Sequence, residues 1–122
     1  MSLQESGEMY LESILVLSQR MEVVRSIDVC EYMGYSKPSI SRAMSLLKND
    51  GFILMDKTGG ITLTETGRCV AEKIYARHTL LTDFLRRLGV DAQTAADDAC
   101  KMEHDISDAS FEALKRHAES VL

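Results

Sequence analysis

A thiol, a carboxylate and an imidazole lie close together in the segment CKMEH, which covers residues 100–104. Residues three and four positions apart share one face of an α-helix, so Cys100, Glu103 and His104 would project from the same side. All three side-chain types bind divalent transition metals. The segment therefore indicates a metal site, although residues at this spacing are more often solvated surface and are weak evidence alone.

Two other segments offer ligands of the same kind. Met9 and Glu12 are three residues apart in a predicted helix near the amino terminus. His78 lies in the middle of a long predicted helix, between Ile74 and Leu81 on its apolar side. A lone histidine in such a place is more often a hydrogen-bonded core residue than a ligand. Three separate elements that each offer ligands nevertheless favour a metal centre.

Apolar residues recur with helical spacing along most of the chain, and one segment between the helices is β-prone. Ser26, Ser36, Asp91 and Ser107 are expected to cap helices. The predicted elements are helices at 7–20, 26–33 and 36–50, a hairpin with strands at 52–55 and 61–63, and helices at 65–88, 91–105 and from 107 onward. This order predicts a mainly α fold. A winged helix-turn-helix DNA-binding domain at residues 4–64 would precede an all-helical metal-binding and dimerisation domain at residues 65–122.

The third predicted helix has the properties of a DNA recognition helix. Ile40, Met44 and Leu47 are spaced for one buried face, which turns small hydroxyls and Arg42 outward toward a major groove. Three basic residues and one acidic residue give positions 36–50 a net charge of +2, in a chain whose net charge is −5. The residues expected to contact DNA are Ser36, Lys37, Pro38, Ser39, Ser41, Arg42 and, at the hairpin tip, Lys57. The alternative is a helix-turn-helix used only for packing or for protein contacts.

The composition is that of an ordinary soluble globular protein, with 45% apolar and 27% charged residues. No apolar run approaches the roughly 20 residues that span a bilayer, and no signal peptide is evident. Three cysteines at wide spacing do not suggest a disulfide framework and suit a reducing compartment. We therefore expect a cytoplasmic protein without a membrane partner.

The last two predicted helices carry apolar faces, and the sixth includes Phe111, Leu114, Ala118 and Val121. Little chain remains to cover these faces, so we expect a homodimer with a two-fold interface. Ordinary packing within one chain is the alternative.

Several segments resemble the diphtheria-toxin repressor and manganese transport regulator family of metal-dependent bacterial repressors. They are EMYLE (8–12), SKPSISRAMSLLKNDG (36–51), LTETG (63–67), RH (77–78), DACKMEH (98–104) and IS (106–107). The resemblance implies a homodimeric repressor of metal homeostasis genes that binds a palindromic double-stranded DNA operator when metal is bound. It also implies a regulatory metal site built from Met9, Glu12, His78, Cys100, Glu103 and His104.

The resemblance combines features of two branches of that family. Met9 and Cys100 are similar to the iron type, whereas Glu12 is similar to the manganese type. Thr82 and Ala96 stand where the iron type has the carboxylate and histidine of an ancillary site, which places that site in doubt. The resemblance leaves open a manganese-type second site built from Glu12 and His78. The C-terminal SH3-like barrel of longer family members is expected to be missing here.

The ligand types narrow the choice of metal. Thioether and thiolate are soft ligands that favour Fe²⁺, Co²⁺, Ni²⁺ or Zn²⁺ over Mn²⁺. We expect Fe²⁺ first and Mn²⁺ second as the native effector, with Zn²⁺, Co²⁺ and Ni²⁺ as substitutes in vitro. A rival hypothesis is a winged-helix regulator that responds to a small organic ligand. An enzyme with a small-molecule substrate is not expected, because Cys100 and His104 come without an oxyanion-hole or glycine-loop signal.

Overall fold

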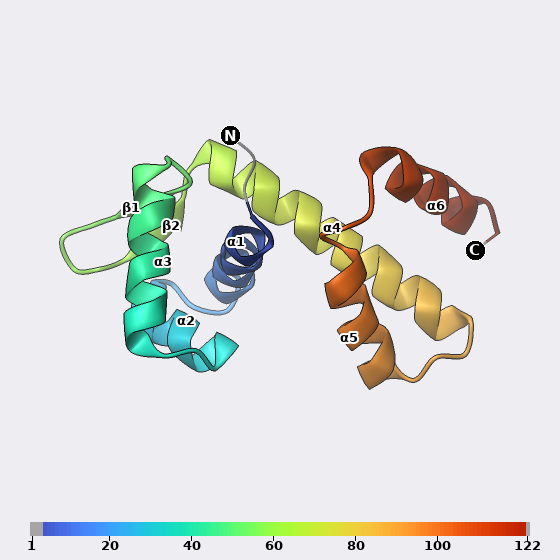
Figure 1. Cartoon of the computed structure of the whole chain (residues 1–122), viewed down its shortest axis with the longest axis horizontal. Helices are drawn as coiled ribbons and strands as arrows, with labels where there is room; N and C mark the ends of the chain where they lie inside the picture. Colours follow the sequence, from blue (N-terminus) through green and yellow to red (C-terminus); the bar gives the residue numbers. More distant parts are fainter. Residues whose placement is uncertain (1–3, 122) are drawn as a thin grey trace. The chain divides into compact units, whose positions relative to one another are not determined.

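The computed structural model describes residues 4–121, and the side chains of residues 4–120 (Figure 1). Within this range the elements are α1 (Glu5–Ser18), α2 (Ser26–Met33), α3 (Lys37–Asn49), β1 (Ile53–Met55), β2 (Ile61–Leu63), α4 (Glu65–Arg87), α5 (Ala92–Met102) and α6 (Asp108–Val121). The predicted mainly α fold, with a winged helix-turn-helix followed by a helical domain, is confirmed. No helix of the described residues is both long and apolar enough to cross a bilayer.

The chain divides into two compact units, an amino-terminal unit of Met1–Glu72 and a carboxy-terminal unit of Lys73–Leu122. The division falls inside α4. The sequence-based boundary between residues 64 and 65, which was drawn between two expected functions, stays a prediction.

Local capping explains where the helices of the amino-terminal unit begin and end. Gly34 ends α2 with a φ of 73°, which a glycine adopts without the steric cost of a Cβ atom. Ser36 caps α3 and accepts a hydrogen bond from the backbone N–H of Ser39, as predicted. The predicted cap Ser26 is wrong, because it is already the first helical residue. The Asp28 carboxylate instead accepts the backbone N–H of Arg25, so α2 is capped from inside its first turn.

The predicted hairpin is confirmed, with β1 antiparallel to β2 and Ile53 opposite Leu63. An isolated bridge between Val24 and Ile61 attaches the segment before α2 to the hairpin, which sequence reasoning did not predict. Gly67, in the first turn of α4, must be a glycine, because a Cβ atom there would lie 2.0 Å from the carbonyl oxygen of Phe52. The hairpin, which is the wing of the fold, is therefore in close backbone contact with α4 on one side and with the segment before α2 on the other.

The amino-terminal unit has one apolar core, to which every element of the unit contributes. Its buried members are Leu11, Ile14, Leu15, Leu17, Val24, Val29, Cys30, Ile40, Met44, Leu47, Ile53, Ile61 and Ala71. The predicted inward face of α3 is thus confirmed. Burial of this apolar surface stabilises the unit, and none of its buried residues is charged.

The carboxy-terminal unit has a different interior. Its buried apolar residues are Ile74, Leu81, Ala95, Ala99, Phe111 and Ala118, and they share the interior with the charged residues Arg77 and Glu103. Leu114 is half-buried on α6, whereas the predicted inward position of Val121 lies outside the described side chains. Because a buried charge needs a partner, this interior identifies the place where polar chemistry is concentrated.

Candidate metal centre and nucleic-acid interface

The carboxylate of Glu103 lies between two imidazole rings. Its Oε2 atom is 3.0 Å from Nδ1 of His78, and its Oε1 atom is 3.3 Å from Nε2 of His104. Glu103 is 0% exposed, and the side chains of His104 and His78 are 1% and 31% exposed. Three of the six predicted metal ligands are therefore brought together in the carboxy-terminal unit.

Two different backbone environments present these three side chains. His78 projects from the middle of α4, between the buried residues Ile74 and Leu81, so the long helix fixes its place. Glu103 and His104 come after the end of α5, which stops at Met102 and not near Asp105 as predicted. The backbone N–H of Glu103 still donates to the carbonyl of Ala99 at 2.9 Å, but the residues that follow form a turn.

The environment of Glu103 fits a divalent cation. Oε1 of Glu103 is buried and accepts no hydrogen bond from the residues that the structure describes. A carboxylate removed from water is costly unless it is paired or binds a metal. Carboxylate and imidazole groups together suit Mn²⁺, Fe²⁺ and Zn²⁺. A buried carboxylate with one oxygen available, flanked by two imidazoles, has the donor set that such an ion requires.

The other predicted ligands lie nearby in sequence or in the other unit. Cys100 is half-buried on α5, three residues before Glu103. Met9 and Glu12 are half-buried on α1 of the amino-terminal unit, beside the fully buried Leu11. The assignment of these three residues as metal ligands stays a prediction.

The surface of α3 has the polarity expected of a DNA-reading helix. Ile40, Met44 and Leu47 are buried. The predicted DNA contacts are all exposed, namely Ser36, Lys37, Pro38, Ser39, Ser41 and Arg42 on or next to α3, and Lys57 in the wing loop. The hydroxyl of Ser36 donates to that of Ser39 at 2.9 Å, so these two residues also serve the helix cap. Their role in DNA binding stays a prediction.

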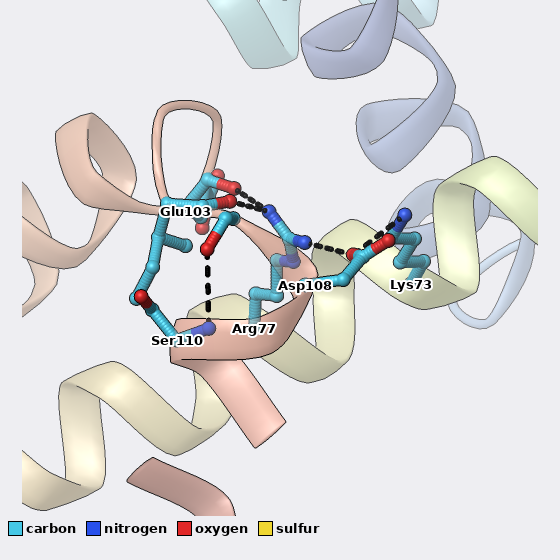
Figure 2. A network of polar contacts seen from close by, with 7 residues as sticks. Lys73, Arg77, Glu103, Asp108 and Ser110 are labelled. Carbon is cyan, nitrogen blue, oxygen red and sulfur yellow. Dashed lines mark hydrogen bonds and ion pairs between the residues drawn. The ribbon is translucent and has the colours of Figure 1, made fainter. Parts of the chain in front are cut away.

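Sequence reasoning missed the part played by Arg77, which is 5% exposed. Its Nη1 atom donates to the backbone carbonyls of Glu103 at 2.9 Å and Ile106 at 2.7 Å, and its Nη2 atom donates to the carboxylate of Asp108 (Figure 2). Lys73 also pairs with Asp108, at 2.9 Å, and these cations hold the pKa of Asp108 below its usual value, Lys73 more than Arg77. A signal existed in the sequence, because Arg77 follows Ile74 by three positions and so falls on the buried face of α4.

Two family models together match almost the whole chain. Residues 2–61 match the N-terminal DNA binding domain of the iron dependent repressor, and residues 64–121 match its metal binding and dimerisation domain. The resemblance stated from the sequence motifs is therefore confirmed over both halves of the chain.

Individual relatives agree with this assignment. The HTH-type transcriptional regulator MntR of Bacillus pumilus is 31% identical over 102 residues, which are 84% of this chain and 71% of that protein. The solved structure of the manganese regulator SloR has a TM-score of 0.82 at 31% identity and covers 98% of this chain and 55% of its own. The metal-dependent transcriptional regulator MtsR has a TM-score of 0.86 at 27% identity, over 93% of this chain and 53% of its own. The chain thus spans about half the length of these two solved structures, and it belongs to the iron dependent repressor family of metal-dependent transcriptional regulators.

Proposed function

We propose that this protein is a repressor of metal homeostasis genes that binds double-stranded operator DNA when a divalent transition metal occupies the site around Glu103. The observation that carries the proposal is the buried Glu103 carboxylate between His78 and His104. These residues lie within the part of the chain that matches a metal binding and dimerisation domain. A binding site for DNA alone would not require a buried carboxylate flanked by imidazoles.

The proposed ligand set draws on both units of the chain. It consists of Met9, Glu12, His78, Cys100, Glu103 and His104. The ion, when bound, supplies positive charge and a common attachment point for these side chains. Met9 and Glu12 belong to α1, in the same unit as the recognition helix α3, so their capture would favour one arrangement of the DNA-reading half. By linkage, a metal that raises DNA affinity has its own affinity raised by DNA to the same extent.

Fe²⁺ and Mn²⁺ are the proposed effectors, and different observations support each. The names of two relatives, a manganese regulator and MntR, support Mn²⁺ for this chain as well. The thioether of Met9 and the thiol of Cys100 are softer donors and support Fe²⁺. Zn²⁺, Co²⁺ and Ni²⁺ should bind in vitro whichever effector is native.

The proposed DNA complex is a homodimer on a palindromic operator. The exposed face of α3 would enter the major groove, where Arg42 is able to make a bidentate contact to guanine. Lys57 in the wing loop would contact a flanking phosphate. A two-fold dimer presents two such helices, which must match half-sites about 34 Å apart or a multiple of that distance.

The family assignment favours this reading over its rivals. Members of the family are metal-dependent regulators, which supports a metal rather than a small organic ligand as the effector. We propose no enzymatic activity, and we propose that the protein acts in the cytoplasm, where its DNA target would be.

The proposal is tested by DNA binding with controlled metal. Genomic fragments are first selected with the Mn²⁺-loaded protein, and their affinity is then measured by fluorescence anisotropy with chelator, Mn²⁺ or anaerobic Fe²⁺. The wild-type chain should bind tightly only with metal. The variant Glu103→Gln should lose the metal response, whereas Glu112→Gln, on the exposed face of α6, should keep it. Equal DNA affinity with and without metal in the wild type would contradict the proposal.

A further inference from the structure

Two of the three clustered ligands stand on a turn rather than on a regular element. Because α5 ends at Met102, the positions of Glu103 and His104 depend on whatever holds the turn that contains them. The carbonyl groups of a helix end and of the turn after it have no partner in the helix itself. Those of Glu103 and Ile106 therefore require a donor from another element.

Arg77 is that donor. A single nitrogen atom, Nη1, donates to the carbonyl oxygens of both Glu103 and Ile106, so it joins the two ends of the turn. The guanidinium lies 5.5 Å from the centre of the Phe111 ring, which packs against it from α6. A buried guanidinium is costly unless its charge and its donors find partners. Two of the three hydrogen bonds of Arg77 go to the backbone around Glu103, and the buried Nε atom has no partner among the described residues.

The guanidinium is itself anchored from a second direction. Its Nη2 atom donates to the carboxylate of Asp108, the first residue of α6, and Lys73 pairs with the same carboxylate at 2.9 Å (Figure 2). In Figure 2 the side chain of Arg77 points from α4 toward the turn, with Glu103 on one side and Asp108 on the other. The turn, α4 and the start of α6 thus meet at one side chain.

We propose that Arg77 is a positioning residue of the metal site. Through the backbone of Glu103 it holds the ligands Glu103 and His104 in place relative to His78, which is its own neighbour along α4. The inference rests on the proposed function, because it assigns Arg77 to the metal site proposed above. Hydrogen bonds that hold the residues around a metal change its affinity, because they decide where the ligand atoms lie before the ion arrives.

The substitution Arg77→Lys separates the effect of the positive charge from the effect of the guanidinium geometry. It keeps the positive charge beside Asp108 but presents one compact ammonium group, which does not reproduce the planar fork of a guanidinium. Asp108→Ala removes the carboxylate that anchors the guanidinium and leaves Arg77 in place. The side chain of Asp108 is 69% exposed, so this substitution does not open the interior. Arg87→Lys is the matched control, because Arg87 is on the same helix and pairs with Asp83 at 2.9 Å on the surface.

The experiment is a titration of the purified full chain with Co²⁺ under reducing conditions, followed by visible absorption. Circular dichroism of the metal-free protein monitors folding. Arg77→Lys should raise the dissociation constant for Co²⁺ by about tenfold to a hundredfold, the range for loss of a residue that orients a metal ligand. It should also alter the ligand-field bands of the saturated protein. Asp108→Ala should change the dissociation constant and the ligand-field bands in the same direction but by less. Arg87→Lys should match the wild type in both measurements.

The outcomes separate the two proposals. If the wild type binds Co²⁺ but Arg77→Lys binds it with the same affinity and the same spectrum, the positioning role is wrong and the metal site stands. A lower thermal stability with an unchanged saturated spectrum would make Arg77 a purely structural residue and would also overturn the inference. If Arg77→Lys does not fold, an unchanged affinity and spectrum for Asp108→Ala overturns it instead. Failure of the wild type to bind Co²⁺ would overturn the metal site itself and the inference with it.

Discussion

The two units of the chain use opposite kinds of interior. In the amino-terminal unit the buried residues are apolar except Ser13, whose hydroxyl donates to the carbonyl of Met9 one turn earlier on the same helix. In the carboxy-terminal unit a buried arginine and a buried glutamate lie among alanines and a few larger apolar residues. An apolar core is stable by itself, whereas a core with charged groups depends on what those groups bind.

This difference corresponds to the proposed division of labour. The amino-terminal unit has to present α3 and the wing in a constant shape, which an apolar core provides. The carboxy-terminal unit has to respond to a cation, so the free energy of its folded state has to depend on whether that cation is bound. The buried carboxylate of Glu103 makes the dependence possible, because an ion that binds there compensates a charge already removed from water.

The largest expected effect tests the independence of the apolar core. Ile40→Ala removes a fully buried side chain from the inward face of α3. We expect a loss of about 2–5 kcal/mol in the free energy of unfolding, because a cavity replaces apolar contacts. The loss should be the same with and without Mn²⁺, as measured by urea denaturation. A loss that Mn²⁺ abolishes would show that the two interiors are not independent.

The second effect concerns the charged core. Binding of a metal to the folded state alone should stabilise the wild type by about 2.7 kcal/mol when the free metal is a hundredfold above its dissociation constant. Glu103→Gln should lose this gain, because the neutral amide no longer offers the ion a charged ligand. Thermal unfolding with Mn²⁺ and with chelator measures it, and Glu112→Gln should behave as the wild type does. An equal gain in Glu103→Gln would remove Glu103 from the site.

The two interiors were not equally predictable from sequence. The buried face of α3, the hairpin and the caps at Ser36 and Asp91 depend on residues a few positions apart, so periodicity and capping rules predicted them. The helix face that was expected to carry Glu103 and His104 ends one residue too early, because α5 stops at Met102. The cap of α2 was predicted wrongly, because Asp28 in the first turn of the helix accepts the backbone N–H of Arg25, whereas Ser26 was expected to be the cap.

The network around Arg77 could not be predicted in the same way. It joins residues that are 26, 29 and 31 positions apart, and no local pattern encodes such contacts. An arginine on an otherwise apolar helix face is a signal that it has buried partners, but the signal does not say which they are. The turn after Met102 combines both kinds of contact, because local backbone hydrogen bonds to the carbonyl of Met102 close it and Arg77 binds it from α4.

A third prediction concerns the exposed face of the amino-terminal unit. Arg42→Ala should weaken specific DNA binding by about 1–3 kcal/mol, the usual contribution of a bidentate contact to a base. The metal affinity of this variant should equal that of the wild type, because α3 carries none of the proposed ligands. Fluorescence anisotropy on the selected operator measures the first quantity, and Arg116→Ala on the exposed side of α6 is the control. Unchanged operator affinity would remove Arg42 from the interface.

The smallest effect sharpens the comparison at the wing, where the amino-terminal unit does use a carboxylate. Oδ1 of Asp56 accepts hydrogen bonds from the hydroxyl of Thr58 and from the backbone N–H groups of Gly60 and Thr58, and these bonds hold the pKa of Asp56 below its usual value of 3.8. A carboxylate whose pKa is lower in the folded state stabilises that state above its unfolded pKa. This contribution is lost as the pH falls below 3.8 and through the lower folded value.

The loss should be confined to the wing, because Asp56 is exposed and its partners are local. When the pH falls and Asp56 is protonated, the hydrogen-exchange rates of the Thr58 and Gly60 amides should increase relative to the rates of other exposed amides at the same pH. Asp56→Asn should show the faster exchange already at neutral pH, while the amides of α1 stay protected. If the wing amides exchange equally slowly in wild type and variant, then Asp56 does not order the loop that carries Lys57. The shape of the wing would in that case depend only on the backbone contacts that join the hairpin to α4 and to the segment before α2.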